Sequence, residues 1–419
     1  MADLEIDLLD HAASTHTLVT PYYIYDLDVL STRAALLLQV FRDMFKPSYA
    51  IKSNPNLSIL RRVISHFDHM DASSAHEVER ALAVGVNPEA ISWSGPGKKR
   101  SELTALAGKG INIVVEAEDE IRCLAEICEG FTQKVIIRIN PDHVPKGFGA
   151  SMAGKPSQFG IDEPEIGSAI DLINRSQGLQ LVGFHAYTGS MCLQPEPIAQ
   201  NIENLCHIFK TAADIAQIEP EIIIFGAGFG IPLHDNQAPL DLVATRDLIA
   251  PHIENIRDCA VLGGATRLLE IGRWISGPMG ALVTEVISTK VSRGTDIAIC
   301  DTGFNNHLAA CGMMGGVFHR NYPFKHLATD AADREIIEQM VAGPLCTSID
   351  LLSKKIELPL LKPGDRLGIS ASGAYGLTAS PTRFISHSEP AEYVIEDRAI
   401  RDVSESRLNQ FGSLVEGLV

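Results

Sequence analysis

Short runs of apolar, often β-branched residues recur along the first two thirds of the chain, and each run ends in a small or polar residue. A stretch with helical spacing follows most of them. The runs lie at Pro47–Ile51, Ile91–Trp93, Ile111–Val115, Val135–Ile139, Leu181–Phe184, Ile222–Phe225 and Leu268–Glu270, with a weaker eighth at His69–Ser73. Strands that alternate with helices at this spacing are typical of a parallel sheet with crossover helices. Seven or eight such units predict an α/β fold with a closed (β/α)8 TIM-type barrel.

The pattern changes after the last of these runs, where apolar and polar positions alternate between Gly, Pro and Asp turns. This pattern predicts a second, mainly antiparallel β domain. Its segments are Leu282–Ile287, Asp296–Ile299, Ile356–Leu358, Arg366–Ile369 and Glu392–Ile395. Tyr22–Tyr25 has the same pattern and is expected to join this domain, whereas Arg398–Val419 is expected to be a helix or a poorly ordered end. We therefore predict a barrel over 28–276 and a β domain over 1–27 plus 277–419.

Composition and charge narrow the class of protein. Apolar residues make up 45% and charged residues 21%, which is typical of a globular chain that can bury a core. The net charge of −17 argues against nucleic acid or an anionic membrane as the main partner, because both need a positive surface. The run Gly97–Arg100 is a local candidate for binding a phosphate, and a solvated loop is its ordinary alternative.

The cysteines indicate whether the protein binds a metal ion, and the N-terminal segment indicates its cellular compartment. The eight cysteines are scattered without CxxC or zinc spacing, so no metal site is predicted. The N-terminus is acidic and lacks an apolar segment, and no apolar run is long enough to cross a bilayer. We therefore expect a cytoplasmic protein with reduced thiols and no membrane partner.

Two candidate catalytic residues follow predicted strands, at the rim where (β/α)8 barrels build active sites. Lys52 comes directly after Pro47–Ile51, and a lysine there is well placed to form a Schiff base with a carbonyl cofactor. An exposed lysine in a turn is the alternative. His185 comes after Leu181–Phe184, where an imidazole is able to stack on a flat cofactor or to act as an acid or base. A satisfied structural histidine is its alternative.

Glycines and further charged residues complete a consistent set. The loops Gly189-Ser190 and Gly226–Gly230 let backbone N–H groups approach a phosphate closely, although tight turns have the same composition. Glu270 is suited to pair with a protonated pyridine nitrogen and Arg273 to anchor a phosphate, unless they form an ordinary ion pair. Cys346 is either a proton donor or an inert thiol. Together these residues favour pyridoxal 5'-phosphate (PLP) as the cofactor.

In order along the chain, the motifs resemble those of the group IV PLP decarboxylases, which have the alanine-racemase fold (fold type III). That family includes the ornithine, arginine and diaminopimelate decarboxylases. The resemblance runs from about Pro21 to Phe384 and rests on Tyr49–Asn54, Asp71 with Ser73-Ser74, His185 with Gly189-Ser190, Gly226–Gly230, Glu270–Arg273, Gly343–Asp350 and Ser372–Tyr375. Ile271 stands where the family has proline.

The resemblance implies a role for each matched residue. Lys52 forms the Schiff base, His185 stacks on the pyridine ring, and Glu270 keeps the ring nitrogen protonated, which favours decarboxylation over racemisation. The implied cofactor-binding set is Lys52, Asp71, His185, Ser190, Gly228, Gly230, Glu270, Gly272, Arg273 and Tyr375. Cys346 is implied to come from a second subunit and to deliver a proton to Cα, so that a homodimer shares its active sites. Substrate contacts are expected from Thr347, Asp350 and His307.

The substrate-specifying positions depart from the diaminopimelate decarboxylases. Those enzymes have a glutamate where this chain has Thr347, and an arginine for the distal carboxylate that has no counterpart in Asp301–Ala310. A site without these charges lacks the complement for diaminopimelate. A closer resemblance is to glutamyl-[acyl-carrier-protein] decarboxylases and exosortase-associated decarboxylases. It is carried by Ser94–Arg100, His185–Gly189, Asn306–Ala310 and Pro344–Thr347.

The implied function is therefore that of a PLP-dependent carboxy-lyase in a biosynthetic pathway. It acts on an amino acid or on a glutamyl-like aminoacyl group tethered to a carrier protein. One alternative is a diaminopimelate, ornithine or arginine decarboxylase acting on a free amino acid, and another is an inactive homologue that serves as a binding protein. A carrier protein is itself acidic, so a chain of charge −17 would repel it unless a basic patch such as Lys98–Arg100 compensates.

Overall fold

The computed structural model describes residues 8–9, 17–151, 153–154, 156–234, 236–313 and 321–405. The chain forms two compact units. One consists of Ala34–Gly230 and Pro239–Gly272, and the other takes the described residues of Met1–Arg33, Ile231–Ala238 and Arg273–Val419. We call them the barrel unit and the β unit and describe each by itself.

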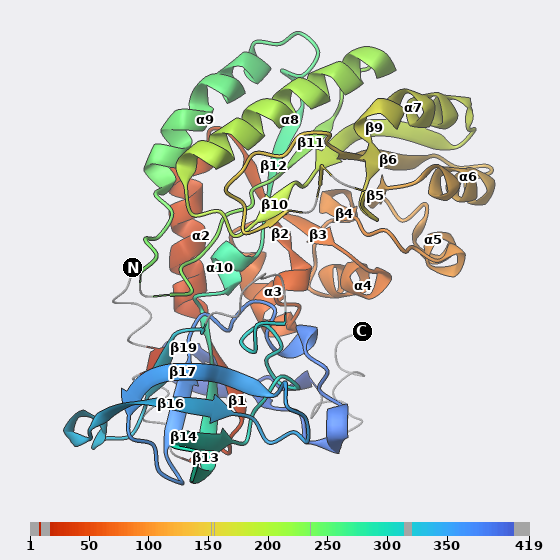
Figure 1. Cartoon of the computed structure of the whole chain (residues 1–419). Helices are drawn as coiled ribbons and strands as arrows, with labels where there is room; N and C mark the ends of the chain where they lie inside the picture. The colour runs from red at the N-terminus through yellow and green to blue at the C-terminus, as the bar shows by residue number, and fades with distance from the viewer. Residues whose placement is uncertain are drawn as a thin grey trace. The chain divides into compact units, whose positions relative to one another are not determined.

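Eight parallel strands form the barrel unit (Figure 1). They are β2 (Lys46–Ala50), β3 (His69–Ala72), β4 (Ile91–Trp93), β5 (Asn112–Val115), β6 (Gln133–Asn140), β9 (Leu179–Ala186), β11 (Ile222–Gly226) and β12 (Thr266–Ile271). Their order is β5-β4-β3-β2-β12-β11-β9-β6, and the pairing of β5 with β6 closes the sheet. The predicted (β/α)8 barrel is confirmed, including its weakest strand, β3. A short strand, β8 (Ile161–Asp162), pairs with the end of β6.

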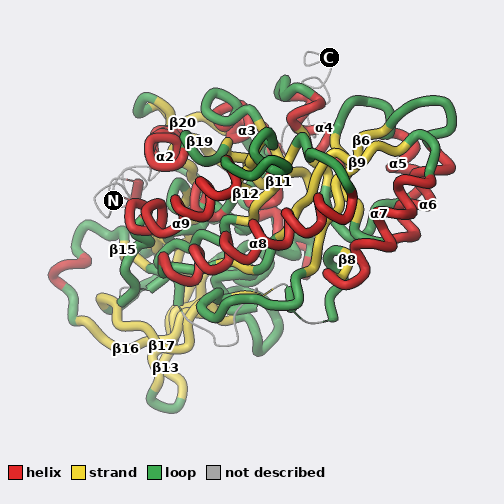
Figure 2. Tube along the Cα trace, turned by 90° about the horizontal axis from the view of Figure 1, so that it is seen from above, coloured by secondary structure: helices red, strands yellow, loops and turns green. Residues whose placement is uncertain are grey.

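One helix precedes the first barrel strand and others follow most of the strands, and capping side chains mark the starts of several. They are α2 (Leu27–Phe41), α3 (Leu57–Val63), α4 (Ala75–Ala83), α5 (Arg100–Leu106), α6 (Glu118–Ile127), α7 (Ile166–Arg175), α8 (Pro195–Ala216) and α9 (Leu242–Arg257). Asn56, Ser74 and Asp241 accept backbone N–H groups at the starts of α3, α4 and α9, as N-cap residues do. Helices α8 and α9 lie side by side in both views (Figure 1, Figure 2).

Buried aliphatic side chains hold neighbouring barrel strands together. One cluster takes a residue from each of five strands, namely Val114, Ile136, Val182, Ile224 and Leu268. Each is at most 2% exposed. The β-branched runs that predicted strands therefore form the packed layers of the barrel, because a sheet closed on itself buries both of its faces.

A mixed but mainly antiparallel sheet forms the β unit. Its strands are β1 (Tyr22–Asp26), β13 (Gly280–Ser292), β14 (Thr295–Cys300), β15 (Phe324–His326), β16 (Ile336–Ala342), β17 (Leu351–Pro359), β18 (Arg366–Ile369), β19 (Ala391–Glu396) and β20 (Ala399–Asp402), and the short helix α10 (Arg273–Ser276) precedes β13. The main path is β17-β16-β14-β13-β1-β19-β20. As expected, β1 joins this sheet, where it lies between β13 and β19.

Three features of the β unit differ from the sequence-based expectation, namely the unpredicted strands β15 and β16 and the C-terminal segment. Strand β16 was not predicted, because its polar Gln339 is buried and its apolar Ile336 is 68% exposed. The Gln339 amide is satisfied by the carbonyls of Leu358 and Pro359, which makes a polar residue tolerable in the sheet interior. The C-terminal segment contains strand β20 where a helix or poor order was expected, and residues 406–419 lie outside the described part of the chain.

Candidate functional site

Four of the sequence-predicted residues meet at the C-terminal ends of the barrel strands. Lys52 lies in the short 3-10 helix Ile51–Ser53, which follows β2. Asp71 lies on β3, Glu270 on β12 and His185 on β9. His185 is inside β9 rather than after it, because the strand runs two residues further than its apolar pattern indicated. Parallel strands of a barrel end at the same rim, so these four side chains converge.

Glu270 is the centre of this cluster. Its Oε1 accepts from Lys52 Nζ at 3.0 Å, and its Oε2 contacts His185 Nε2 at 3.1 Å. Lys52 Nζ also lies 3.4 Å from Asp71 Oδ2, and Asp71 Oδ1 accepts from Ser94 Oγ at 3.0 Å. The side chains of Asp71, His185 and Glu270 are buried, whereas the Lys52 side chain is 37% exposed. The lysine is therefore both reachable from outside and held by two buried carboxylates.

The surroundings give the two carboxylates different charge states. Burial and the nearby charge of Glu270 raise the pKa of Asp71 to about 7, although Lys52 opposes the shift. Burial also acts to raise the pKa of Glu270, but Lys52 and His185 outweigh it and hold that pKa well below its usual value. Burial lowers the pKa of His185 despite its contact with Glu270. The site thus holds an ionised glutamate beside a neutral histidine and an aspartate that titrates near neutrality.

Two glycine loops of the barrel unit pack against each other. The strands β7 (Ala150–Ser151) and β10 (Gly189–Ser190) form a small antiparallel ribbon. Gly228 has φ +65°, and a Cβ there would lie 2.5 Å from the Phe148 ring and 2.7 Å from the carbonyl oxygen of Gly189. The N–H of Gly230 donates to the carbonyl of Cys192 at 2.7 Å. Only glycine fits at Gly228, so this loop is shaped by close approach of backbone and not by turn formation alone.

Gly272 marks a similar close approach at the end of β12. A Cβ there would meet the Cβ atoms of Ser53 and Ala50 at 3.0 and 3.3 Å. The absence of a side chain at Gly272 lets the end of β12 lie directly against the turn that carries Lys52.

Within the β unit, Arg273 lies over the ring of Tyr375, with 4.6 Å between the guanidinium carbon and the ring centroid. The Nη1 atom of Arg273 is buried and has no hydrogen-bond partner among the described residues. Tyr375 adopts φ +53° and Ala371 φ +56°, a conformation that L-residues seldom take without a local cause. A buried guanidinium with a donor to spare is suited to an anionic ligand such as a phosphate.

His307 and Asp350 of the β unit are engaged inside the protein. His307 Nδ1 accepts from the N–H of Ala310 at 3.2 Å, and its Nε2 contacts Ser372 Oγ at 3.0 Å. Burial and the charge of Arg273 lower the pKa of His307 to about 3. Asp350 accepts from the N–H groups of Phe304 and Leu345, each at 2.8 Å. These contacts favour positioning roles over the substrate contacts predicted for both residues.

The loop that Asp350 anchors displays the remaining two predicted residues. Cys346 is exposed and Thr347 is half-buried, and the N–H of Thr347 donates to the carbonyl of Leu345 at 2.7 Å. All eight cysteines of the chain, Cys346 included, are free thiols.

The basic run Gly97–Arg100 consists of one buried lysine side chain and three exposed residues. The Lys98 side chain is 2% exposed, and its Nζ pairs with Glu120 at 2.8 Å. Arg100 is exposed but pairs with Glu126 at 2.7 Å. Lys98 therefore does not belong to a solvated basic patch, because it lies inside the protein beside a carboxylate. Gly97, Lys99 and Arg100 are exposed, as in a solvated loop.

Four other residues of the site were not identified from sequence as functional. Ser94 binds Asp71, and the Tyr187 ring lies 5.7 Å from Lys52 Nζ. Glu116, just after β5, and Arg138, on β6, form a buried ion pair at 3.0 Å. Ser94, Glu116 and Tyr187 each directly follow a barrel strand, and this position was the available signal for them. Arg138 lies inside β6, where nothing local distinguishes it.

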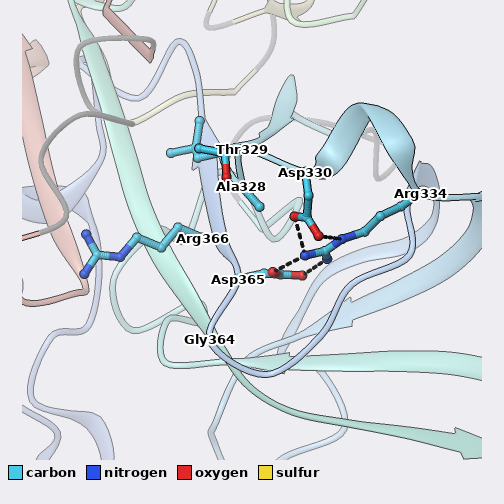
Figure 3. A pocket seen from close by; sticks show the side chains of 8 residues that line it. Ala328, Thr329, Asp330, Arg334, Gly364, Asp365 and Arg366 are labelled. Carbon is cyan, nitrogen blue, oxygen red and sulfur yellow. Dashed lines mark hydrogen bonds and ion pairs between the residues drawn. The ribbon is translucent and has the colours of Figure 1, made fainter.

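A cavity of about 250 Å³ lies elsewhere, within the β unit, and contains none of the predicted site residues. Its lining comprises Leu327, Ala328, Thr329, Asp330, Arg334, Gly364, Asp365 and Arg366. Figure 3 shows the Arg334 guanidinium bound between Asp330 and Asp365. The charges of Arg334, Asp330 and Asp365 are thus already paired with one another, and the cavity offers no catalytic group.

The donor set fits PLP. The barrel rim supplies a primary amine for the aldehyde and an ionised carboxylate for a protonated ring nitrogen. The Nδ1 atom of His185 is buried without a hydrogen-bond partner among the described residues, as is Arg273 Nη1 in the β unit. In the described part of the chain, no group of three or more His, Cys, Asp and Glu side chains is arranged to hold a metal ion, and no helix is long and apolar enough to cross a membrane.

Comparison with known proteins gives consistent matches along the chain. Residues 27–277 match the family described as "Pyridoxal-dependent decarboxylase, pyridoxal binding domain". The L-glutamyl-[BtrI acyl-carrier protein] decarboxylase of Niallia circulans is 32% identical over 397 residues, which cover 93% of this chain and 92% of that protein. The diaminopimelate decarboxylase of Methanothermobacter thermautotrophicus is 30% identical over 413 residues, covering 95% and 91%.

Solved structures show the same fold. The crystal structure of diaminopimelate decarboxylase from Helicobacter pylori complexed with L-lysine superposes with a TM-score of 0.81 at 28% identity, and the match covers 94% of this chain and 98% of that chain. The arginine decarboxylase of Paramecium bursaria Chlorella virus, at 19% identity and a TM-score of 0.78, supports the fold alone.

Proposed function

The chain belongs to the pyridoxal-dependent decarboxylases, and from that premise we propose that it decarboxylates a glutamyl-like aminoacyl group tethered to a carrier protein. The observation that carries this proposal is the uncharged Thr347 in the loop held by Asp350. The family membership makes the protein a PLP-dependent carboxy-lyase. Lys52, Glu270, Arg273 and Cys346 are all present, which argues against the alternative of an inactive homologue.

The barrel residues hold and tune the cofactor in this proposal. PLP, when bound, withdraws the electrons that the departing carboxylate leaves on Cα. Lys52 Nζ is the amine that attaches it, and ionised Glu270 holds the proton on the ring nitrogen. The neutral imidazole of His185 presents a flat face to the ring. Asp71 stays beside Lys52 and is able to take up or release a proton near neutral pH.

The phosphate is assigned to the glycine loops and to the arginine that follows β12. Gly228 and Gly230 bring backbone close, Ser190 offers a hydroxyl, and Arg273 offers its unpaired Nη1. Tyr375 supports Arg273 through its ring. Gly272 lets the end of β12 lie close to the turn that carries Lys52.

Cys346 is proposed to act in the active site of a second copy of the chain. Its thiol is exposed, so it is free to reach a partner's site, where it would deliver a proton to Cα after carbon dioxide leaves. In this proposal the enzyme is a homodimer with two shared sites. We also propose a cytoplasmic location, which the eight free thiols support.

The tethered substrate follows from the chemistry of its distal end. Loss of the α-carboxylate requires that group to be free, so a glutamyl group must be attached through its side-chain carboxyl. Its distal end is then an uncharged acyl group, which needs no charged partner at Thr347. A free diaminopimelate would bring an ammonium and a carboxylate to this end and would leave both unpaired.

A decarboxylase for a free amino acid is the second candidate, and the similarity to diaminopimelate decarboxylases favours it. The two candidates are distinguished by supplying glutamyl carrier protein, diaminopimelate, ornithine and arginine separately and measuring carbon dioxide release. We expect turnover on the carrier-bound substrate and at least about a hundredfold lower kcat/KM on the free ones. Efficient turnover of a free diamino acid would overturn the tethered-substrate proposal.

A lysine substitution tests the cofactor assignment in the same assay. Lys52→Ala is expected to remove activity by a factor of about 1000 or more, because the amine that attaches the cofactor is gone. Lys99→Ala, an exposed lysine of the barrel unit, is the matched control and should keep normal turnover. Retained activity in a folded Lys52→Ala enzyme would refute the assignment.

A further inference from the structure

Lys98 has no role in the function proposed above, yet its side chain is buried and its ammonium has three close polar contacts. Its Nζ donates to the carbonyls of Gly95 and Val114, each at 2.7 Å, and pairs with Glu120 at 2.8 Å. The two carbonyls take two of its three N–H donors, and Glu120 neutralises its charge. A lysine held in this way fixes the segments that it contacts, whereas an ordinary surface lysine is solvated.

Glu116 is the second buried charge in the same place. Its side chain is 1% exposed, and both of its oxygens contact Arg138 Nη1, at 3.0 and 3.1 Å. It also accepts from the N–H groups of Gly95 at 2.5 Å and Gly160 at 3.1 Å. Glu116 thus ties together segments that follow three different barrel strands, β4, β5 and β6.

One backbone hydrogen bond joins the two charge pairs into a network. The N–H of Glu116 donates to Glu120 Oε2 at 3.0 Å, so Lys98, Glu120, Glu116 and Arg138 form one connected group, which we call the brace. It contains two cations and two anions and is neutral as a whole. Removing one member would leave an unpaired buried charge, and for this reason the brace resists rearrangement.

The brace reaches the cofactor lysine through Gly95 and Ser94. Glu116 holds the N–H of Gly95 and Lys98 holds its carbonyl, which fixes this glycine at φ +112°. The preceding residue, Ser94, donates its hydroxyl to Asp71 Oδ1 at 3.0 Å. Asp71 Oδ2 in turn lies 3.4 Å from Lys52 Nζ.

A second arm of the brace lies beside His185. Arg138 on β6 and His185 on β9 are paired in the parallel register, so their side chains leave the sheet on the same face. The Arg138 guanidinium is held by Glu116 and lies 4.9 Å from the centroid of the Phe159 ring. His185 then contacts Glu270 at 3.1 Å.

We infer that Lys98 and Glu116 are positioning residues of the cofactor site, and that the brace holds Asp71 through Ser94 and supports His185 through Arg138. Neither residue touches the reacting atoms. Because these residues act on cofactor binding, their role does not depend on which amino acid is the substrate.

The test compares Lys98→Met and Glu116→Gln with two controls, Lys99→Met and Glu129→Gln, whose wild-type side chains are exposed. Apoprotein is titrated with PLP to obtain the dissociation constant, and circular dichroism is recorded in the absorption band of the bound cofactor. We expect the brace variants to bind PLP at least about tenfold more weakly, the effect of losing one buried charge-assisted hydrogen bond. Their cofactor dichroism should change, and the controls should match wild type in both measurements.

A purely structural role would have a different signature. If the brace variants melt at lower temperature but bind PLP with unchanged affinity and dichroism, the brace serves folding alone and the inference is overturned. Where a single variant does not fold, the pair Lys98→Met with Glu120→Gln removes a cation and an anion together and keeps the site neutral. Wild-type affinity and dichroism in that folded pair would likewise overturn the inference, and weakened binding supports it.

Discussion

Two buried carboxylates, Asp71 and Glu270, lie on either side of the Lys52 amine, and their different neighbours set their different charge states. Glu270 has two cation-capable contacts, Lys52 and His185, and stays ionised. Asp71 has the more distant contact with Lys52 and a neutral hydroxyl from Ser94. A barrel rim built in this way keeps one strong anion for the cofactor and one group that exchanges protons near neutral pH.

This difference leads to a pH-dependent stability expectation for Asp71→Asn. The pKa of Asp71 rises from an ordinary 3.8 to about 7 on folding, so the folded protein binds an extra proton between these values and loses stability as pH rises through this window. Asparagine removes that penalty. Cofactor-free Asp71→Asn should therefore be more stable than wild type above pH 7, by roughly 1–4 kcal/mol, and nearly equal to it at about pH 4.

Thermal unfolding midpoints measured across this pH range give the comparison directly. The expected gain amounts to several degrees at high pH. A midpoint difference that does not vary with pH would show that Asp71 does not titrate in this window.

At the scale of elements, loops that follow strands carry the site, and glycine determines how closely they pack. The barrel places Gly189-Ser190 and Gly226–Gly230 against each other, and Phe148 packs on Gly228. The apolar pattern predicted the strands before these loops, because burial on both faces selects β-branched runs. It did not predict β16, whose buried Gln339 depends on the carbonyls of Leu358 and Pro359 in the neighbouring strand β17.

Gly228→Ala tests this packing. The added Cβ would lie 2.5 Å from the Phe148 ring, and the residue would have to keep φ +65°. We expect a loss of about 1–3 kcal/mol of stability, together with weaker PLP binding, because the loop must move to relieve the contact. Gly264→Ala is the matched control, since a Cβ at Gly264 meets nothing within 4 Å. Equal behaviour of the two variants in thermal unfolding and PLP titration would contradict this account.

At the scale of the whole molecule, the proposed catalytic groups are divided between two compact units. Lys52, His185 and Glu270 belong to the barrel unit, whereas Cys346 belongs to the β unit. The proposed homodimer explains this division, because each site would then draw its proton donor from the partner subunit.

Mixing two inactive variants tests the shared site. Lys52→Ala and Cys346→Ala should each show very low decarboxylation. After subunits exchange in an equal mixture, half of the dimers are mixed and each of these has one intact site, so about a quarter of wild-type activity should return. No recovery, in a mixture shown to have exchanged, would place both residues in a site built from one chain.

The charge of the whole chain bears on how a carrier protein would bind. The net charge is −17, and Lys98 is not available at the surface. Because two acidic proteins repel each other, added salt should screen the repulsion and lower KM for the carrier-bound substrate. Steady-state kinetics from about 20 to 300 mM salt measure this. A KM that rises with salt would instead reveal an attractive basic surface for the carrier.

The local sequence pattern determined where the barrel strands lie along the chain, and it assigned Tyr22–Tyr25 to the β unit. It also placed Lys52 directly after a strand and Glu270 within one. These features are local because each strand needs its own apolar run, and each candidate group follows or ends one. Tertiary structure alone decided which charges are buried together. Glu116 and Arg138 are 22 residues apart in the chain, and Lys52 and Glu270 are 218 apart. Barrel closure brings such partners within about 3 Å of each other. The Lys98 ammonium is buried only in this tertiary structure, because no local pattern connects it to Glu120, which neutralises its charge.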